Sequence, residues 1–136
     1  VRNCYTSWLA DYRATIELFA QNRQALDRVF IRYKDWGADH SSLPITRKEI
    51  DIFKIERRRF EECFNEYAVI ICPNFGTISA KCIYNNLRHL TYFSPYSPVD
   101  QKLMGNILSL DGIFNDFEKF YDEVKYVLLE IQSHSD

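Results

Sequence analysis

Apolar side chains recur at every seventh position along the last part of this sequence. Two such rows, offset by four residues, run side by side: Leu103, Leu110, Phe117, Val124 and Ile131 in one, and Ile107, Phe114, Tyr121 and Leu128 in the other. Positions three, four and seven residues apart share one face of an α-helix. A repeat of seven held over this length is typical of helices that pack side by side in a bundle. The pattern therefore predicts a long helix, with Ser97 as its cap and Pro98 in its first turn.

Shorter rows predict two more long helices, over about residues 3–36 and 46–72, and a short helix over about 77–90. Thr46 and Glu49 have the spacing of a capping box, which marks the start of the second long helix.

Two segments offer an alternative to helix. The stretch 67–72 is apolar enough for a strand, but its continuity with a capped, periodic segment favours helix. Asp111-Gly112 is a point at which the last helix could break. Short connections complete the prediction: an all-α fold, built as an antiparallel, up-down-up-down helical bundle of three long helices and one short helix, in a single domain over residues 1–136.

The composition argues against an all-β fold, because four Gly and four Pro in 136 residues are few for one, which agrees with a helical prediction.

The composition also argues against two kinds of partner, nucleic acid and the membrane interior. The net charge of −2 lacks the basic surplus of nucleic-acid-binding proteins. The sequence contains no run of eighteen apolar residues, so no membrane span is expected. The compartment is left open, with the cytoplasm favoured.

Two arginines interrupt the apolar rows of the first two predicted helices. In an antiparallel pair, Arg23 and Arg57 lie at similar levels, and unpaired charge inside a bundle is costly. One hypothesis is therefore a site for an anionic ligand formed by Arg23, Arg57, Phe19, Phe60 and Phe64. The alternative is that both guanidinium groups reach solvent or form ion pairs along their own helices.

Several apolar or small residues fall outside the predicted helix seams. Together they form a candidate interface: Ile52, Ile55, Gly105, Leu108, Gly112, Tyr92, Phe93 and Tyr96. Glycine on an outer helix face lets another backbone approach, and aromatic side chains carry much interface energy. The alternative is that the short helix and the aromatic loop cover these positions.

Catalytic and metal-binding patterns are weak. His40, His89 and His134 lack the paired spacing of helical metal ligands, so no metal and no cofactor is expected. Acidic pairs four residues apart, Glu62 with Glu66 and Glu118 with Asp122, leave a Mg²⁺-dependent hydrolase as a remote alternative.

Cys4, Cys72 and Cys82 fall at one end of the predicted bundle, where a disulfide among them is feasible in an oxidising compartment. Buried free thiols are the alternative.

The leading functional interpretation is a non-catalytic helical-bundle module that acts through protein–protein contact as an oligomer. A sensor that binds a small anionic molecule is the second interpretation, and the hydrolase is the third. Partner and biological process are left open.

Overall fold

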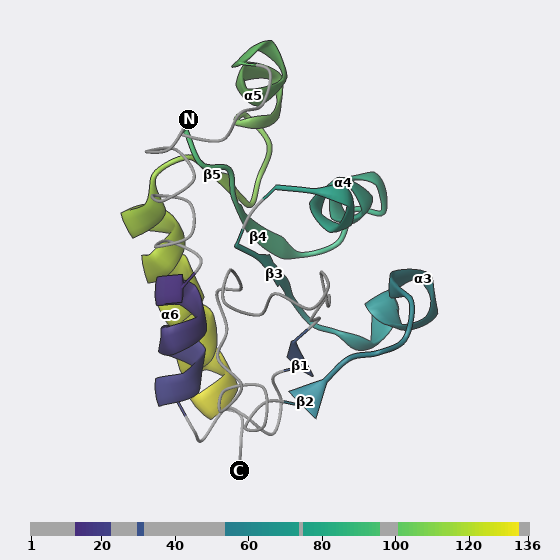
Figure 1. Cartoon of the computed structure of the whole chain (residues 1–136), viewed down its shortest axis with the longest axis vertical. Coiled ribbons are helices and arrows are strands. Elements are labelled where there is room, and N and C mark those ends of the chain that lie inside the picture. Colours follow the sequence, from purple (N-terminus) through teal and green to yellow (C-terminus); the bar gives the residue numbers. More distant parts are fainter. Residues whose placement is uncertain (1–12, 23–29, 32–53, 74, 96–100, 134–136) are drawn as a thin grey trace, which may run out of the picture.

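The computed structural model describes residues 13–22, 30–31, 54–73, 75–95 and 101–133. Its centre is a three-stranded parallel β-sheet flanked by helices, so the all-α prediction is wrong (Figure 1). The predicted up-down-up-down arrangement of helices is therefore wrong as well. No helix in the described part of the chain is long and apolar enough to cross a membrane, which confirms that expectation for these residues.

The sheet contains strands β3 (Ile70–Cys72), β4 (His89–Tyr92) and β5 (Ile113–Phe114), in that order. All neighbours are parallel, and Thr91 of β4 pairs with Cys72 on one side and Ile113 on the other. Parallel neighbours require a crossover connection. Helix α4 (Thr77–Tyr84) connects β3 to β4, and α5 (Gln101–Ile107) connects β4 to β5.

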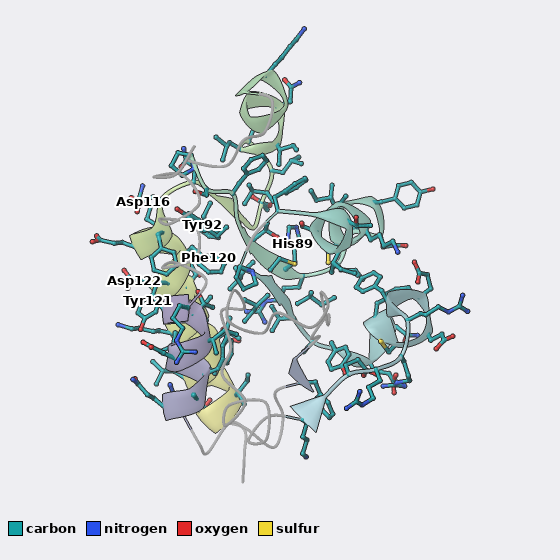
Figure 2. All side chains as sticks on the ribbon, in the orientation of Figure 1. His89, Tyr92, Asp116, Phe120, Tyr121 and Asp122 are labelled. Carbon is teal, nitrogen blue, oxygen red and sulfur yellow. The ribbon has the colours of Figure 1, made fainter. Side chains whose placement is uncertain are left out.

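Helices cover both faces of the sheet. Helix α6 (Phe117–Ser133) and the helical segment 13–21 lie on one side, and α4 lies on the other (Figure 1). Successive side chains of a strand point to opposite faces. Leu90 and Tyr92 therefore join the core beneath α6, whereas Phe93 packs on the α4 and α5 side with Ile107. Figure 2 shows the same division, with Tyr92 and Phe120 on the α6 side and His89 on the other.

Helix α6 is the part of the predicted bundle that the structure confirms most fully. Val124 and Leu128, one from each apolar row, are buried in the core, together with Phe120 from outside both rows. The Asp116 carboxylate accepts a hydrogen bond of 3.0 Å from the Glu118 amide and so caps the first turn.

The remainder of the predicted last helix is not continuous. Its apolar rows cross α5, a turn and β5 before they reach α6, and Leu110 is 41% exposed in that turn. The predicted helix is interrupted at Asp111-Gly112, because Gly112 has φ +85°, a conformation that helices do not contain.

The predicted continuous helix over 46–72 is wrong, because only Phe60–Cys63 is α-helical in the part of this range that the structure describes. The chain forms strand β2 (Lys54–Ile55), helix α3 (Phe60–Cys63), the 3₁₀ turn η3 (Phe64–Glu66) and strand β3. β-Branched residues such as Ile70 and Ile71 favour a strand buried on both faces, which shows no alternation in sequence. The capping box at Thr46 lies outside the described residues.

The predicted helix over 3–36 is confirmed only for residues 13–21. Strand β1 (Phe30–Ile31) lies in its predicted range and pairs in parallel with β2. The short helix predicted over 77–90 is confirmed as α4, but its last residues belong to β4.

Candidate functional site

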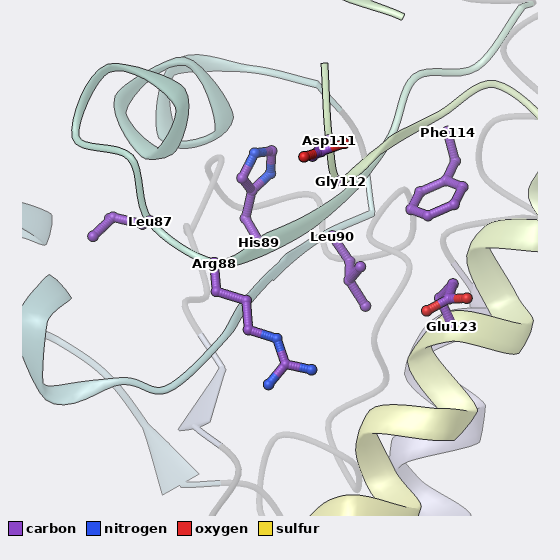
Figure 3. A pocket seen from close by; sticks show the side chains of 8 residues that line it. All are labelled: Leu87, Arg88, His89, Leu90, Asp111, Gly112, Phe114 and Glu123. Carbon is purple, nitrogen blue, oxygen red and sulfur yellow. The ribbon is translucent and has the colours of Figure 1, made fainter. Parts of the chain in front are cut away.

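A surface hollow of about 390 Å³ lies where β4 and β5 begin (Figure 3). Its lining joins the residues that lead into these strands to one residue of α6: Leu87, Arg88, His89, Leu90, Asp111, Gly112, Phe114 and Glu123. Because neighbours along a strand point to opposite faces, the hollow has two arms. His89 lines one arm, and Leu90 lines the other, which faces α6.

Gly112 is essential to this geometry. Its φ of +85° is a conformation that L side chains rarely adopt, and a Cβ there would overlap the carbonyl oxygen of His89. The Gly112 carbonyl accepts a hydrogen bond of 2.7 Å from the Thr91 amide. Glycine therefore lets β5 approach β4 closely.

His89 is the buried titratable group of the site. Its Nδ1 lies 2.9 Å from Oγ1 of Thr91. Burial lowers the pKa of the His89 imidazole below its usual value of 6.5, so the ring is neutral at pH 7.

The contacts of Thr91 favour one tautomer of His89. A Thr91 hydroxyl that donates to the thiol of Cys72 accepts, at its oxygen, from Nδ1–H of His89. Nε2 is then a bare acceptor. No polar side-chain atom in the described residues is both buried and unpaired, so Nε2, which Thr91 does not contact, is open to solvent.

Charges at the rim of the hollow are unequal. The guanidinium of Arg88 lies 3.3 Å from the Glu130 carboxylate, and both side chains are about half exposed, so the pair adds little stability. Asp111 and Glu123 are exposed carboxylates. With Arg88 already paired, the hollow presents an excess of negative charge. Leu90 and Phe114 supply apolar surface in the arm that faces α6 (Figure 3).

The residues of the predicted anionic site are not brought together. Phe19 lies in the core beneath α6, whereas Phe60 stacks on Phe64 in α3 and η3, with ring centroids 5.4 Å apart. Arg57 is exposed. Arg23 lies outside the described residues.

The predicted interface residues are scattered. Tyr92 and Phe93 are 2% and 0% exposed, so they belong to the core of this chain. The backbone that approaches Gly112 is that of His89 in the same chain. Leu108 packs against the core around Phe93.

Of the other predicted interface positions, Gly105 is exposed with open space around it. Ile55 lies in β2. Ile52 and Tyr96 lie outside the described residues.

The predicted acidic pairs do not form a metal centre in the described part of the chain, where no group of three His, Cys, Asp or Glu side chains is suited to a metal ion. Glu62 pairs with Arg59 at 2.9 Å, and Glu66 pairs with Arg58 at 2.5 Å. Glu118 and Asp122 are exposed on α6.

His89 is one of the three histidines considered from the sequence, but it was not predicted as a site residue. One signal pointed to it: His89 stands in the segment Leu87–Tyr92, which follows Asn85-Asn86 and ends in Thr91-Tyr92, two residue types that favour strands. Asp111-Gly112 marked the other side of the hollow as a break in helix. Only the pairing of β4 with β5 brings the two together.

Comparisons with protein-family models, with curated proteins and with solved structures find no match to this chain.

Proposed function

We propose that this protein binds a small organic cation, with an apolar body, in the hollow where β4 and β5 begin. One observation carries the proposal: His89 and the carboxylate residues Asp111 and Glu123 line the same hollow, and its arginine is paired with Glu130. A neutral imidazole nitrogen accepts a hydrogen bond from an ammonium group, and carboxylates attract its charge.

The apolar side chains of the hollow support the same ligand class. Small-molecule sites combine apolar lining with a few polar groups that fix orientation. Here Leu90 and Phe114 offer the apolar surface, and the polar side chains other than Arg88, which is paired with Glu130, can act as acceptors. The charge is opposite to that of the ligand predicted from Arg23 and Arg57, because the residues that meet in the fold are different ones.

The position is not the usual one for a parallel sheet. Open α/β sheets generally bind ligands beyond the carboxyl ends of their strands, where helix N-termini favour anions. This hollow lies at the amino ends and is built from side chains. A cation therefore suits it better than a phosphate does.

A matched pair of probes tests the proposal. Tryptamine and indole-3-acetate share an indole ring and carry opposite charges at neutral pH. Calorimetry should detect tryptamine binding and no indole-3-acetate binding, and tryptamine should shift the amide NMR signal of Gly112.

Single substitutions connect this binding to the hollow. Glu123→Gln should weaken tryptamine binding by about threefold or more, the size expected for one exposed charge pair. Asp122→Asn is the control, because Asp122 is exposed on the same helix and is not part of the lining. Equal binding of both probes, or unchanged binding in both Glu123→Gln and Asp111→Asn, would exclude the cation site.

Self-association is a second candidate, favoured by the outer surface of α6. Tyr126 and Leu129 are each 62% exposed, which is unusual for large apolar side chains spaced three apart on a helix. Beside them lies a hollow of about 230 Å³ lined by Leu18, Asn22, Lys125, Leu128 and Leu129. A second copy of this chain would bury this surface on both subunits at once. This keeps the contact function predicted from sequence and moves it to other residues.

Light scattering tests the second candidate. The chain should have the mass of a dimer, and Leu129→Glu should convert it to a monomer. Lys119→Glu, a charge change elsewhere on α6, should leave the dimer intact. A monomer at all concentrations would remove this candidate and leave the cation site unaffected.

A further inference from the structure

A chain of four hydrogen-bonded side chains lies buried between the sheet and α4. Nδ1 of His89 contacts the Thr91 hydroxyl at 2.9 Å, the Thr91 hydroxyl contacts the Cys72 thiol, and the Cys72 thiol contacts the Cys82 thiol. All four residues are buried. Two cysteines from separate elements are thus in direct contact through their sulfur atoms.

The fold determines this contact. Cys72 is the last residue of β3, and its register partner across the sheet is Thr91, so the two side chains lie beside each other on the same face. Cys82 lies three residues after Ser79 on α4, and both are buried against the sheet. Nine residues lie between the two cysteines, and the crossover from β3 into α4 brings them together.

We propose that Cys72 and Cys82 are an oxidisable dithiol, which a small hydroperoxide converts to a disulfide between β3 and α4. The proposal does not require the cation site, since the two cysteines are not part of its lining; His89 alone belongs to both. The sequence left open a disulfide among Cys4, Cys72 and Cys82, and the proposed bond joins the last two. Cys4 lies outside the described residues.

The reaction balances with the hydroperoxide as the oxidant. The Cys82 sulfur attacks the terminal peroxide oxygen, the O–O bond breaks, and the alcohol leaves with the Cys82 proton. This step produces a sulfenic acid on Cys82. The Cys72 sulfur then attacks the Cys82 sulfur, the S–O bond breaks, and hydroxide leaves with the Cys72 proton as water. Two thiols are oxidised by two electrons, and one peroxide is reduced to an alcohol and water.

The contact between the two cysteines affects both thiols. The hydrogen bond between them lowers the pKa of the Cys82 thiol, while the same contact and burial raise the pKa of Cys72. The thiolate is the nucleophile, so these directions favour Cys82 as the first nucleophile, and the overall reaction balances in either order. A small peroxide is the suitable oxidant because both cysteines are buried, so that bulky disulfides do not reach them.

Thiol counting tests the proposal on the full chain. Reduced protein should take up four N-ethylmaleimide groups after unfolding, because it has four cysteines. After treatment of the folded protein with hydrogen peroxide and removal of the peroxide, it should take up two. Its mass before alkylation should fall by two hydrogen atoms.

Tryptic digestion locates the bond. Trypsin cleaves after Lys81 and so separates Cys82, in peptide 82–88, from Cys72, in peptide 60–81. Oxidised protein should yield these two peptides joined. Peptide 60–81 also contains Cys63, a buried cysteine on α3 whose thiol donates to the Arg59 carbonyl at 3.4 Å.

Cys63→Ala is therefore the matched control and should retain the joined peptides. Cys72→Ala and Cys82→Ala should each abolish the joined species and leave all three remaining cysteines alkylatable, or one of them as a sulfenic acid. The proposal is overturned if the joined peptides persist in Cys72→Ala, if Cys4 supplies the bond, or if four thiols remain after peroxide treatment of the folded chain. Amide NMR spectra of each variant show whether it is folded.

Discussion

The backbone of Gly112 packs directly on the carbonyl of His89, with no room between them for a side chain. The contact joins two strands and defines one wall of the hollow. Position 112 therefore couples the stability of the sheet to the shape of the candidate site.

Gly112→Ala should lower the free energy of unfolding by about 2 kcal/mol or more, from the strained backbone at φ +85° and the overlap with His89. Urea denaturation measures this. Gly105→Ala is the matched control: Gly105 lies inside α5, exposed with open space around it, and alanine should stabilise the helix by about 1 kcal/mol. Similar effects at both positions would contradict the assigned geometry of Gly112.

Phe120→Ala should lower the free energy of unfolding by about 3–5 kcal/mol, because Phe120 is fully buried against Tyr92, Phe114 and Phe117. Leu110→Ala should cost less than about 1 kcal/mol, since Leu110 is partly exposed in a turn. The helical bundle predicted from sequence requires a core role for Leu110. Urea denaturation of the two variants thus decides between the folds.

The same residues explain why a helical bundle was predicted from the sequence. Rows of seven predict helix because they fit its period, and α6 does contain two of them. The rows extend through β5 by coincidence, since Leu110 and Phe114 belong to a turn and a strand. Strand β4 is buried at all four positions, so it lacks the alternation by which a strand is found in sequence.

Less of the candidate site than of the fold could be predicted from the sequence. The site is formed by residues that lie far apart in the chain, such as His89 with Gly112 and Cys72 with Thr91. Local periodicity contains no information on such pairs. The sequence did suggest a break at Asp111-Gly112 and a possible contact of Cys72 with Cys82. Both suggestions assumed a helical bundle, which the structure does not have.

Glu56 should stabilise the fold in a pH-dependent way. Hydrogen bonds from Arg58 and then Tyr67 lower the pKa of the Glu56 carboxyl from 4.5 to about 2. A depressed folded pKa means that the stabilisation is complete above the unfolded value and is lost as the pH falls from about 4.5 to about 2. The difference in unfolding free energy between the wild type and Glu56→Gln should shrink over that interval.

Carbon NMR of the Glu56 carboxyl provides a direct check. Arg58→Met removes the largest cause and should raise the pKa of Glu56 toward 4.5. Tyr67→Phe should raise it less. A titration of Glu56 near 4.5 in the wild-type protein would refute the Arg58 and Tyr67 contacts.

His89 should oppose folding in acid. Its folded pKa lies below 6.5 because of burial, so below pH 6.5 the unfolded chain binds a proton that the folded chain excludes. Stability should therefore decrease as the pH falls through 6.5, and His89→Asn should reduce this slope. Nitrogen NMR of the ring should show the Nδ1–H tautomer at pH 7. A ring that titrates above 6.5 would contradict its buried placement.

The central position of β4 has a consequence for how the domain opens. The amides of Thr91 and Phe93 donate to the carbonyls of Gly112 and Phe114, each at 2.7 Å, while helices cover both faces of the strand. Both protons point from the central strand toward β5, which is an edge strand of the sheet. Their exchange with deuterium requires that β5 separate from β4, so these two amides should report the opening of this edge.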